Sequence, residues 1–429
     1  MVARPAEAVA PCVRGTALGT DLAPLRLCLF DLDDTLLRTD DLESFRWPVE
    51  VGRVGGDYER RLAAEYASRE DRAIYTQEDL LELAGRFPTL AWGIVTRAPA
   101  HYAHALLGLA YPNVPWTSVI AREQVRATKP EPDGVRRAMA EGEIEHGEEV
   151  LLVGDALVDV QAAYRAGCRS ALETSAWGRP ADADCFEALS RLPDAIVRGP
   201  AELAAILERP THGLPELEYR LASGGDAERP TGRVEYIEHR LPDETDPSRT
   251  KVAVLGRYFT KASRLDERRG RHTLSEQIIG RKSATTFPET WIQALRTVLL
   301  TECYAKRALV TVIPAKAERI RRLEALLEQL ARSHREQPVR DDREYVFAPD
   351  LLAFDARAVA NKTANPGDRE RNVRDHLHVV DPDRVRGEHV IVIDDVVTTG
   401  ATLRWADRRL REAGATTVSP VALAKSVQR

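Results

Sequence analysis

Short apolar runs alternate with stretches of helical spacing along the chain, which predicts strands connected by helices. In the first half, three apolar runs end directly before polar side chains: Leu25 to Phe30, Trp92 to Val95 and Val150 to Val153. Between the first two, apolar residues recur at helical spacing from Tyr58 to Ala67 and from Gln77 to Leu83. This order predicts an α/β domain that carries its functional side chains at the ends of its strands.

The second half repeats this pattern. Glu289 to Lys306 predicts a helix that leads into a strand, Ala308 to Ile313. Apolar residues then recur at helical spacing from Ile320 to Leu330, and we interpret the arginines there as a solvent-exposed face. The four β-branched residues Val390 to Ile393 predict a strand that is buried on both faces of a parallel sheet. We therefore expect a second doubly wound α/β domain.

Two carboxylates and a turn of small residues follow this last strand. Asp394 and Asp395 are expected where the strand ends, and Leu403 to Ala413 has helical spacing. The turn between them consists of Thr398, Thr399, Gly400, Ala401 and Thr402. A strand, a tight turn and a helix direct backbone N–H groups and the helix dipole at an anion. Because the carboxylates suit sugar hydroxyls or a metal, the pattern predicts a ribose 5-phosphate site; the alternative is an ordinary strand, turn and helix.

Val390 to Thr402 resembles the phosphoribosyl pyrophosphate (PRPP) signature of the type I phosphoribosyltransferases. The resemblance implies that Asp394 and Asp395 bind the ribose hydroxyls and that the turn binds the 5-phosphate. It further implies a pyrophosphate loop and a mobile loop. Their candidate residues are Ala315, Lys316 and Ala317 for the first, and Lys362 and Arg371 for the second.

Arg371, Asn372 and Val373 precede a strand predicted from His376 to Val380. This segment resembles the competence-protein-F-like branch of that family. The cysteines that bind zinc in longer members of this branch are absent, so the resemblance implies the fold and not a substrate. We assign no role to Leu351 or to Phe354 to Arg357.

The first predicted strand, Leu25 to Phe30, is followed by Asp31, Asp33, Asp34 and Thr35. Carboxylates at the end of an apolar strand are costly unless they bind something. Alternation places Asp31 and Asp33 on the same side, where their oxygens are suited to Mg²⁺. The segment resembles the first motif of the haloacid dehalogenase (HAD) superfamily. The later motifs of that superfamily are matched in order by Thr96, Lys129, Asp155 and Asp159.

This resemblance implies a phosphatase that forms an aspartyl-phosphate. Asp31 would be the nucleophile and Asp33 the general acid and base. Thr96 and Lys129 would hold the phosphoryl oxygens. The metal ligands would come from Asp31, Asp33, Asp155 and Asp159. The insertion from about residue 41 to 88 would be a short helical cap over the active site.

Composition narrows the choice of partners. The chain has 429 residues, of which 43% are apolar and 30% charged, and its net charge is −6. This balance gives no support to general nucleic-acid or membrane binding. The five cysteines form no paired motif, so we expect a reduced, cytoplasmic protein without disulfides. The basic run from Arg264 to His272 is interpreted as a solvated loop.

We expect a disordered lead-in at residues 1–24, a HAD-like domain at 25–208, a linker at 209–231 and a phosphoribosyltransferase domain at 232–429. The hypothesis is a bifunctional, Mg²⁺-dependent enzyme of nucleotide or nucleoside metabolism, with PRPP and a phosphorylated small molecule as partners. A homodimer is compatible with this arrangement. Two alternatives remain: a HAD phosphatase regulated by a PRPP-sensing or nucleotide-sensing domain, and a nucleic-acid end phosphatase. A strand is predicted from Val252 to Phe259, but residues 232–288 receive no function.

Overall fold

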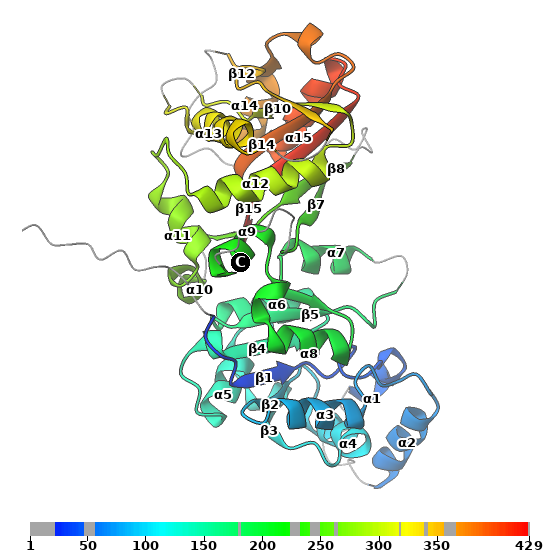
Figure 1. Ribbon diagram of the computed structural model, residues 1–429. Coiled ribbons are helices and arrows are strands. Elements are labelled where there is room, and N and C mark those ends of the chain that lie inside the picture. The colour runs from blue at the N-terminus through cyan, green and yellow to red at the C-terminus, as the bar shows by residue number, and fades with distance from the viewer. Residues whose placement is uncertain are drawn as a thin grey trace, which may run out of the picture.

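The computed structural model describes residues 22–46, 56–178, 182–223, 232–240, 249–260, 265–316, 319–338, 342–355 and 366–427. These residues form two α/β regions, each built on its own sheet, which lie one above the other in Figure 1. We call residues 22–208 the N-terminal region and residues 209–427 the C-terminal region. No helix among the described residues is long and apolar enough to span a bilayer.

The N-terminal region is built on a six-stranded sheet in the order β3-β2-β1-β4-β5-β6, and every neighbouring pair is parallel. Its strands are β1 (Leu27–Phe30), β2 (Ala91–Val95), β3 (Trp116–Ile120), β4 (Val150–Gly154), β5 (Arg169–Glu173) and β6 (Ala195–Val197). The strand order reverses between β1 and β4. In such sheets the crevice beyond the carboxyl ends of these two strands is the usual ligand site.

Helices connect these strands. They are α4 (Ala100–Ala110), α5 (Asp133–Glu141), α6 (Leu157–Arg165), α7 (Ala183–Ser190) and α8 (Pro200–Glu208). The insertion between β1 and β2 consists of a 3₁₀ turn at Asp40–Leu42, α1 (Glu43–Arg46), α2 (Gly56–Ala67) and α3 (Gln77–Arg86). Thr76 begins α3 with a capping box closed by Asp79. α3 packs against α8, and buried side chains of α1, α2 and α3 all belong to the hydrophobic core on this side of the sheet.

The C-terminal region has a sheet in the order β11-β10-β14-β15-β8-β7, with β9 also paired to β15. Its strands are β7 (Glu235–Arg240), β8 (Arg249–Val254), β9 (Arg257–Phe259), β10 (Arg307–Val312), β11 (Glu344–Phe347), β14 (His389–Val397) and β15 (Thr417–Val427). Its main helices are α12 (Glu289–Glu302), α13 (Arg322–Glu336) and α15 (Ala401–Glu412). Strand order reverses between β10 and β14, which predicts the ligand crevice there.

Two strands predicted in the second half are corrected. The single strand predicted from Val252 to Phe259 is two strands, β8 and β9, and β7 and β8 form one edge of the sheet. The strand predicted from His376 to Val380 is the short β13 (Leu377–Val379), which pairs only with β12 (Leu352–Phe354), away from the main sheet. It is preceded by α14 (Pro366–His376).

The predicted linker is also wrong, because much of it is folded between the two regions. It contains a 3₁₀ turn at Pro210–Gly213 and α9 (Glu216–Ser223), in which Glu216, Leu217, Glu218 and Arg220 are buried. Low periodicity hid this helix, since its buried positions carry charges. Glu216 is bound by Arg220 of the same helix at 2.5 Å.

A buried ion-pair network joins the regions. Arg257, whose side chain is 1% exposed, contacts Asp194 at 2.9 Å and also pairs with Glu218. Its Nη1 donates to the Tyr164 hydroxyl at 2.9 Å. Burial favours the neutral forms of Asp194 and Glu218. Arg257 outweighs burial and holds the pKa values of both carboxyls well below the usual range. The network therefore fixes the two regions against each other.

The predicted solvated loop at Arg264 to His272 belongs to the same interface. Its described residues form α10 (Asp266–Gly270) and end at His272, the N-cap of α11 (Thr273–Gly280). Arg268 pairs with Asp194 and donates to the Cys168 carbonyl at 2.8 Å. The sequence shows these basic residues without showing their partners, which come from the other half of the chain.

Candidate functional sites

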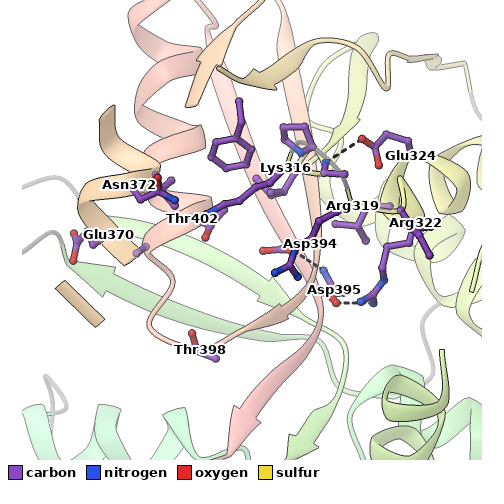
Figure 2. A pocket seen from close by; sticks show the side chains of 18 of the residues that line it. Lys316, Arg319, Arg322, Glu324, Glu370, Asn372, Asp394, Asp395, Thr398 and Thr402 are labelled. Atoms are coloured by element: carbon purple, nitrogen blue, oxygen red, sulfur yellow. Dashed lines mark hydrogen bonds and ion pairs between the residues drawn. The ribbon is translucent and has the colours of Figure 1, made fainter. Parts of the chain in front are cut away.

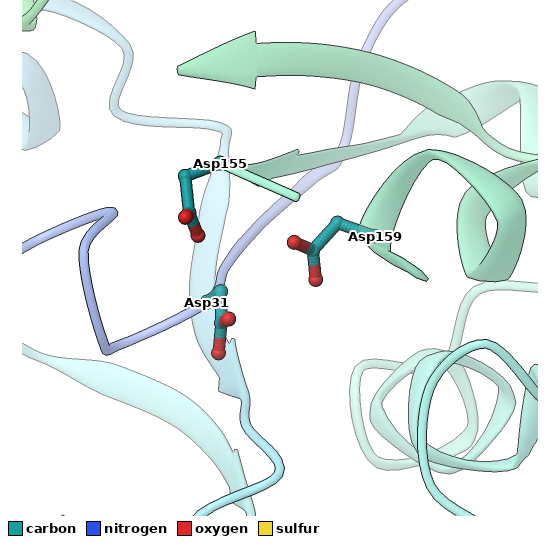
Figure 3. A group of neighbouring side chains, drawn as sticks. All are labelled: Asp31, Asp155 and Asp159. Carbon is teal, nitrogen blue, oxygen red and sulfur yellow. The ribbon is translucent and has the colours of Figure 1, made fainter. Parts of the chain in front are cut away.

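Three carboxylates meet beyond the carboxyl ends of β1 and β4. Asp31 follows β1, Asp155 follows β4, and Asp159 lies in the first turn of α6. One oxygen of each carboxylate lies within 4.8 Å of the others, and Figure 3 shows the three side chains converging. The structure therefore brings together three of the four predicted metal ligands, at the position where the strand order reverses.

Lys129 is fixed among these carboxylates. Its Nζ lies 2.8 Å from Asp31 Oδ1 and 2.6 Å from Asp159 Oδ1, and its side chain is 1% exposed. Burial lowers the pKa of this ammonium, but the two carboxylates outweigh burial and raise it above its usual value. Lys129 is therefore charged at neutral pH and offsets part of the negative charge.

The acidic cluster fits a hard divalent cation. Burial, together with Asp159 and Asp31, raises the pKa of Asp155 to about 8, although the Thr35 hydroxyl donates to its Oδ1 at 3.0 Å. Lys129 alone therefore leaves negative charge in this site uncompensated. Oxygen ligands with surplus negative charge are the donors that Mg²⁺ prefers. Asp31, Asp155 and Asp159 are the described residues that would hold it.

Asp33 lies apart from this cluster, which corrects its prediction as a metal ligand. Its Oδ1 accepts a hydrogen bond from the Tyr102 hydroxyl at 3.0 Å and lies 3.0 Å from Arg46 Nη2. Burial raises the pKa of Asp33 to about 6, although Arg46 acts in the opposite direction. A carboxyl group with this pKa can exchange a proton near neutral pH, which suits the predicted acid and base.

The hydroxyl predicted to hold a phosphoryl oxygen lies at the same edge of the sheet. Thr96 directly follows β2, next to β1, and its buried Oγ1 accepts a hydrogen bond from Ala98 N at 3.0 Å. Sequence reasoning missed Arg46 and Tyr102. They belong to α1 and α4, and neither lies in a motif, so only the fold could place them beside Asp33.

A second site is a cavity of about 670 Å³ beside β10 and β14 (Figure 2). The residues of the predicted ribose 5-phosphate site that line it are Asp394, Asp395, Thr398, Thr399, Ala401 and Thr402. Gly400 caps α15 with φ of 76°, a conformation that favours glycine. The structure therefore brings the acidic pair and the turn to one pocket, where the strand order reverses.

The acidic pair was predicted at the end of its strand. In the structure it lies inside β14 instead. Pairing with β10 stops at Ile393, whereas pairing with β15 continues to Val397. Asp394 and Asp395 therefore lie beyond the end of β10, on the part of β14 that pairs only with β15 among the described strands. Burial and the neighbouring Asp395 raise the pKa of Asp394 well above its usual value.

Arg322 corrects the interpretation of the α13 arginines as a solvent-exposed face. Its Nη2 lies 2.6 Å from Asp395 Oδ2, and its side chain is 18% exposed. Arg319 also lines the cavity. Helical spacing correctly predicted the buried Leu323, Leu327 and Leu330 of α13, whereas Ile320 lies before the helix and is 51% exposed. The spacing carries no information on what the first turn of the helix faces.

The remaining candidates are divided. Ala315 and Lys316 line the cavity, and Ala315 N donates to Glu324 Oε1 at 3.0 Å. Ala317 and Lys362 lie outside the described residues. Arg371 is exposed and does not line the cavity, whereas its neighbours Glu370 and Asn372 do.

Phe354, to which no role was assigned from the sequence, also lines this cavity. The Nζ of Lys316 lies 5.3 Å from the centre of its ring. An aromatic residue at the end of a short strand is common in any fold, so no signal in the sequence could have assigned it.

Comparison with known families supports the first site. Residues 64–172 match the family model described as haloacid dehalogenase-like hydrolase. The N-terminal region contains a HAD-like hydrolase domain. The match is limited to a minority of the chain, and it includes Thr96, Lys129, Asp155 and Asp159 but not Asp31. No curated protein matches the chain significantly.

Several solved structures are similar to the N-terminal part of the chain. A predicted phosphoglycolate phosphatase from Haemophilus somnus is 18% identical, covers 42% of this chain and 97% of its own, and has a TM-score of 0.32. CbbY from Rhodobacter sphaeroides, in complex with phosphate, is 20% identical, with coverages of 42% and 96% and a TM-score of 0.33. A HAD-superfamily hydrolase from Ehrlichia chaffeensis is 16% identical, with coverages of 43% and 97% and a TM-score of 0.29.

Proposed function

We propose that the N-terminal region is a Mg²⁺-dependent phosphatase that acts through an aspartyl-phosphate on a phosphorylated small molecule. The observation that carries this proposal is that Asp31 and Asp33 lie in different surroundings. Asp31 is held by Lys129 beside Asp155, whereas Asp33 lies apart with Tyr102 and Arg46 and has a pKa of about 6.

In this proposal an Asp31 oxygen attacks phosphorus while the protonated Asp33 donates its proton to the leaving oxygen. Asp33 then accepts a proton from the water that hydrolyses the phosphorylated Asp31. Lys129 and Thr96 hold the phosphoryl oxygens throughout both steps. A Mg²⁺ ion held by Asp31, Asp155 and Asp159 would supply charge stabilisation when bound.

We further propose that the C-terminal region binds PRPP and transfers its phosphoribosyl group, which would make the protein bifunctional. The supporting observation is that one cavity contains both Asp394 and Asp395 and the turn from Thr398 to Thr402. The carboxylates would bind the ribose hydroxyls, and the turn would bind the 5-phosphate through its N–H groups and the start of α15. A base or another nucleophile would displace pyrophosphate, in a reaction of nucleotide or nucleoside metabolism.

Fusion of the two activities has a physical rationale. Phosphoribosyl transfer is reversible, so removal of a phosphate from its product would draw the reaction forward. The test is to incubate the protein with PRPP, Mg²⁺ and a panel of bases, and to follow PRPP, pyrophosphate and phosphate together. Phosphate release from phosphorylated metabolites without any consumption of PRPP would leave only the phosphatase.

Contacts along β15 favour a second candidate, in which the C-terminal region senses PRPP and regulates the phosphatase. The ammonium group of Lys425 donates to the Thr398 carbonyl of the proposed phosphate turn. Two residues later, Val427 packs in the same cluster as Trp177, whose Nε1 donates to the Asp155 carbonyl at 3.0 Å. β15 therefore runs from the proposed phosphate turn to the cluster against which Trp177 packs.

This candidate is separated from the first by a binding experiment. As a sensor, the protein would bind PRPP stoichiometrically and leave it intact, and its phosphatase turnover would change. Trp177→Phe keeps an aromatic ring but removes the hydrogen bond to Asp155, so it should weaken that response without abolishing PRPP binding. An unchanged response in Trp177→Phe would contradict this route.

A further inference from the structure

Another cavity lies between the two regions, away from both proposed active sites. Its volume is about 300 Å³, and it is lined by residues from β5 and its flanking loops on one side and by α9 and α11 on the other. This size is at the lower end for pockets that bind small molecules, and domain interfaces are a common place for such pockets.

Charge in this cavity is unbalanced toward positive. Four arginines line it against three carboxylates: Arg169, Arg257, Arg268 and Arg271 against Glu148, Asp194 and Glu218. Burial lowers the pKa of His272, which also lines the cavity, so this side chain adds little positive charge. The lining is therefore left with about one excess positive charge at neutral pH.

The carboxylates of the cavity already have cationic partners. Arg257 and Arg268 pair with Asp194, and Arg257 also pairs with Glu218. Arg271 Nη1 lies 3.5 Å from Glu148 Oε2 at the rim. None of these carboxylates is within ion-pair distance of Arg169 among the pairs formed by described residues.

Arg169 is the cation left over. It is the first residue of β5, it is only 6% exposed, and it lines the cavity. Its Nη2 donates to the Ala23 carbonyl, whereas its buried Nη1 has no hydrogen-bond partner among the described residues. Burial lowers the pKa of this guanidinium to about 10. A buried cation with an unsatisfied donor is costly, and an anion within the cavity would remove that cost.

Apolar side chains also line the cavity. They are Leu214, Leu221, Ala222 and Leu274. We propose that this cavity is a binding site for a small organic anion, with a single carboxylate or phosphate-type group on Arg169 and a compact apolar body against these four side chains. Because both regions line it, a bound anion would also strengthen their contact.

Two probes test this site by isothermal calorimetry without added Mg²⁺. Benzoate carries the carboxylate, phenylphosphonate carries a phosphate-like group that cannot be hydrolysed as an ester, and neutral benzamide is the control. We expect saturable binding of at least one anion and none of benzamide. Whichever anion binds more tightly identifies the acidic group that the site prefers.

Variants locate the binding. Arg169→Met should weaken the bound anion by about ten-fold or more, as expected for loss of a charge-assisted hydrogen bond. Arg271→Gln, at the half-exposed rim, should weaken it less. Thr398→Ala, in the other cavity, should leave it unchanged. Without a probe, Arg169→Met should melt no lower than the unmodified protein, because the substitution removes a desolvated charge.

Two results would overturn the proposal. One is that neither anion binds. The other is that Arg169→Met, folded and with an unchanged melting temperature, binds both anions as tightly as the unmodified protein.

Discussion

The two proposed active sites use the same architectural position in different ways. Each lies beyond the carboxyl ends of parallel strands, where the strand order reverses. In the N-terminal site the functional side chains contact one another, and Lys129 is held between two carboxylates. In the C-terminal site the acidic pair and the phosphate turn surround an open cavity of about 670 Å³.

This difference indicates where the chemistry of each site resides. A covalent mechanism needs its nucleophile and cation fixed before the substrate arrives, so the protein itself carries the reacting group. A ribosyl donor carries its own leaving group, so its site mainly has to bind and orient. Substitutions in the first site should therefore abolish turnover, whereas substitutions in the second should mainly reduce affinity.

The largest effect should come from Asp31→Asn. The amide has nearly the same shape but cannot act as the nucleophile, so phosphatase turnover should fall by about 10⁴-fold or more. PRPP affinity should not change. Steady-state hydrolysis of a phosphometabolite panel measures the first quantity and calorimetry the second. Asp40→Asn, on the surface, is the matched control, and residual activity within ten-fold of the unmodified protein would exclude Asp31 as the nucleophile.

Breaking the connection between the regions should be the next largest effect. Arg257→Met leaves Asp194 and Glu218 buried without their shared cation, which should cost roughly 3–5 kcal/mol of unfolding free energy at pH 7. The pKa values of both carboxyls are low in the folded protein, so their stabilising effect is present above about pH 4.5 and is lost as the pH falls further.

The pH dependence of Arg257→Met should differ from that of the unmodified protein. Without the arginine, burial raises both pKa values, so acid neutralises the two carboxyls earlier. The stability deficit should therefore narrow as the pH is lowered from 7 toward 4, as measured by urea unfolding. The control is Arg386→Met, whose pair with Asp383 is exposed and should contribute about 0–1 kcal/mol. A deficit that does not vary with pH would argue against the ion-pair explanation.

A smaller effect is expected from Asp394→Asn combined with Asp395→Asn. These substitutions replace the carboxyl acceptors of the ribose hydroxyls with amides, so PRPP should bind about 10- to 100-fold more weakly. Phosphatase turnover should remain unchanged in the absence of PRPP. The exposed Asp383→Asn is the control in the same calorimetric titration. Unaltered PRPP affinity in the double variant would exclude this cavity as the PRPP site.

The sequence predicted much of the fold and the motifs of both sites. Buried strands such as Val150 to Val153 carry continuous apolar runs, and the side chains that follow them are contiguous in the chain. It failed where one residue acquires its role from a distant partner. Arg46 and Arg322 occur on ordinary helices, and only the fold brings them to Asp33 and Asp395.

The domain interface was missed for a related reason. Glu218, Arg257 and Arg268 are charged, and charge normally indicates solvent exposure. Here the opposite charges neutralise one another in a buried network between halves of the chain. Periodicity records which positions are apolar and cannot record which charges are paired, so α9 was predicted as a linker and α10 as part of a loop.

The smallest predicted effect compares two ligands in the cavity beside β10 and β14. Phe354 lines it beside Lys316, and PRPP has no base that could stack on the ring. A nucleoside 5′-monophosphate has both the ribose phosphate and the base. Stacking of a base on an aromatic side chain contributes roughly 1–3 kcal/mol relative to alanine. Phe354→Leu keeps part of the apolar surface, so it should weaken binding of the preferred monophosphate by only about five-fold.

PRPP affinity in this variant should stay within about two-fold of the unmodified value, since the proposed contacts of PRPP lie with Asp394, Asp395 and the turn. Calorimetry with a panel of monophosphates and with PRPP compares the two ligands in one protein. Tyr304→Leu, an exposed aromatic outside the cavity, controls for loss of a ring elsewhere. If PRPP weakens as much as the monophosphate, Phe354 contacts the ribosyl donor, and the base must be bound by another wall of the cavity.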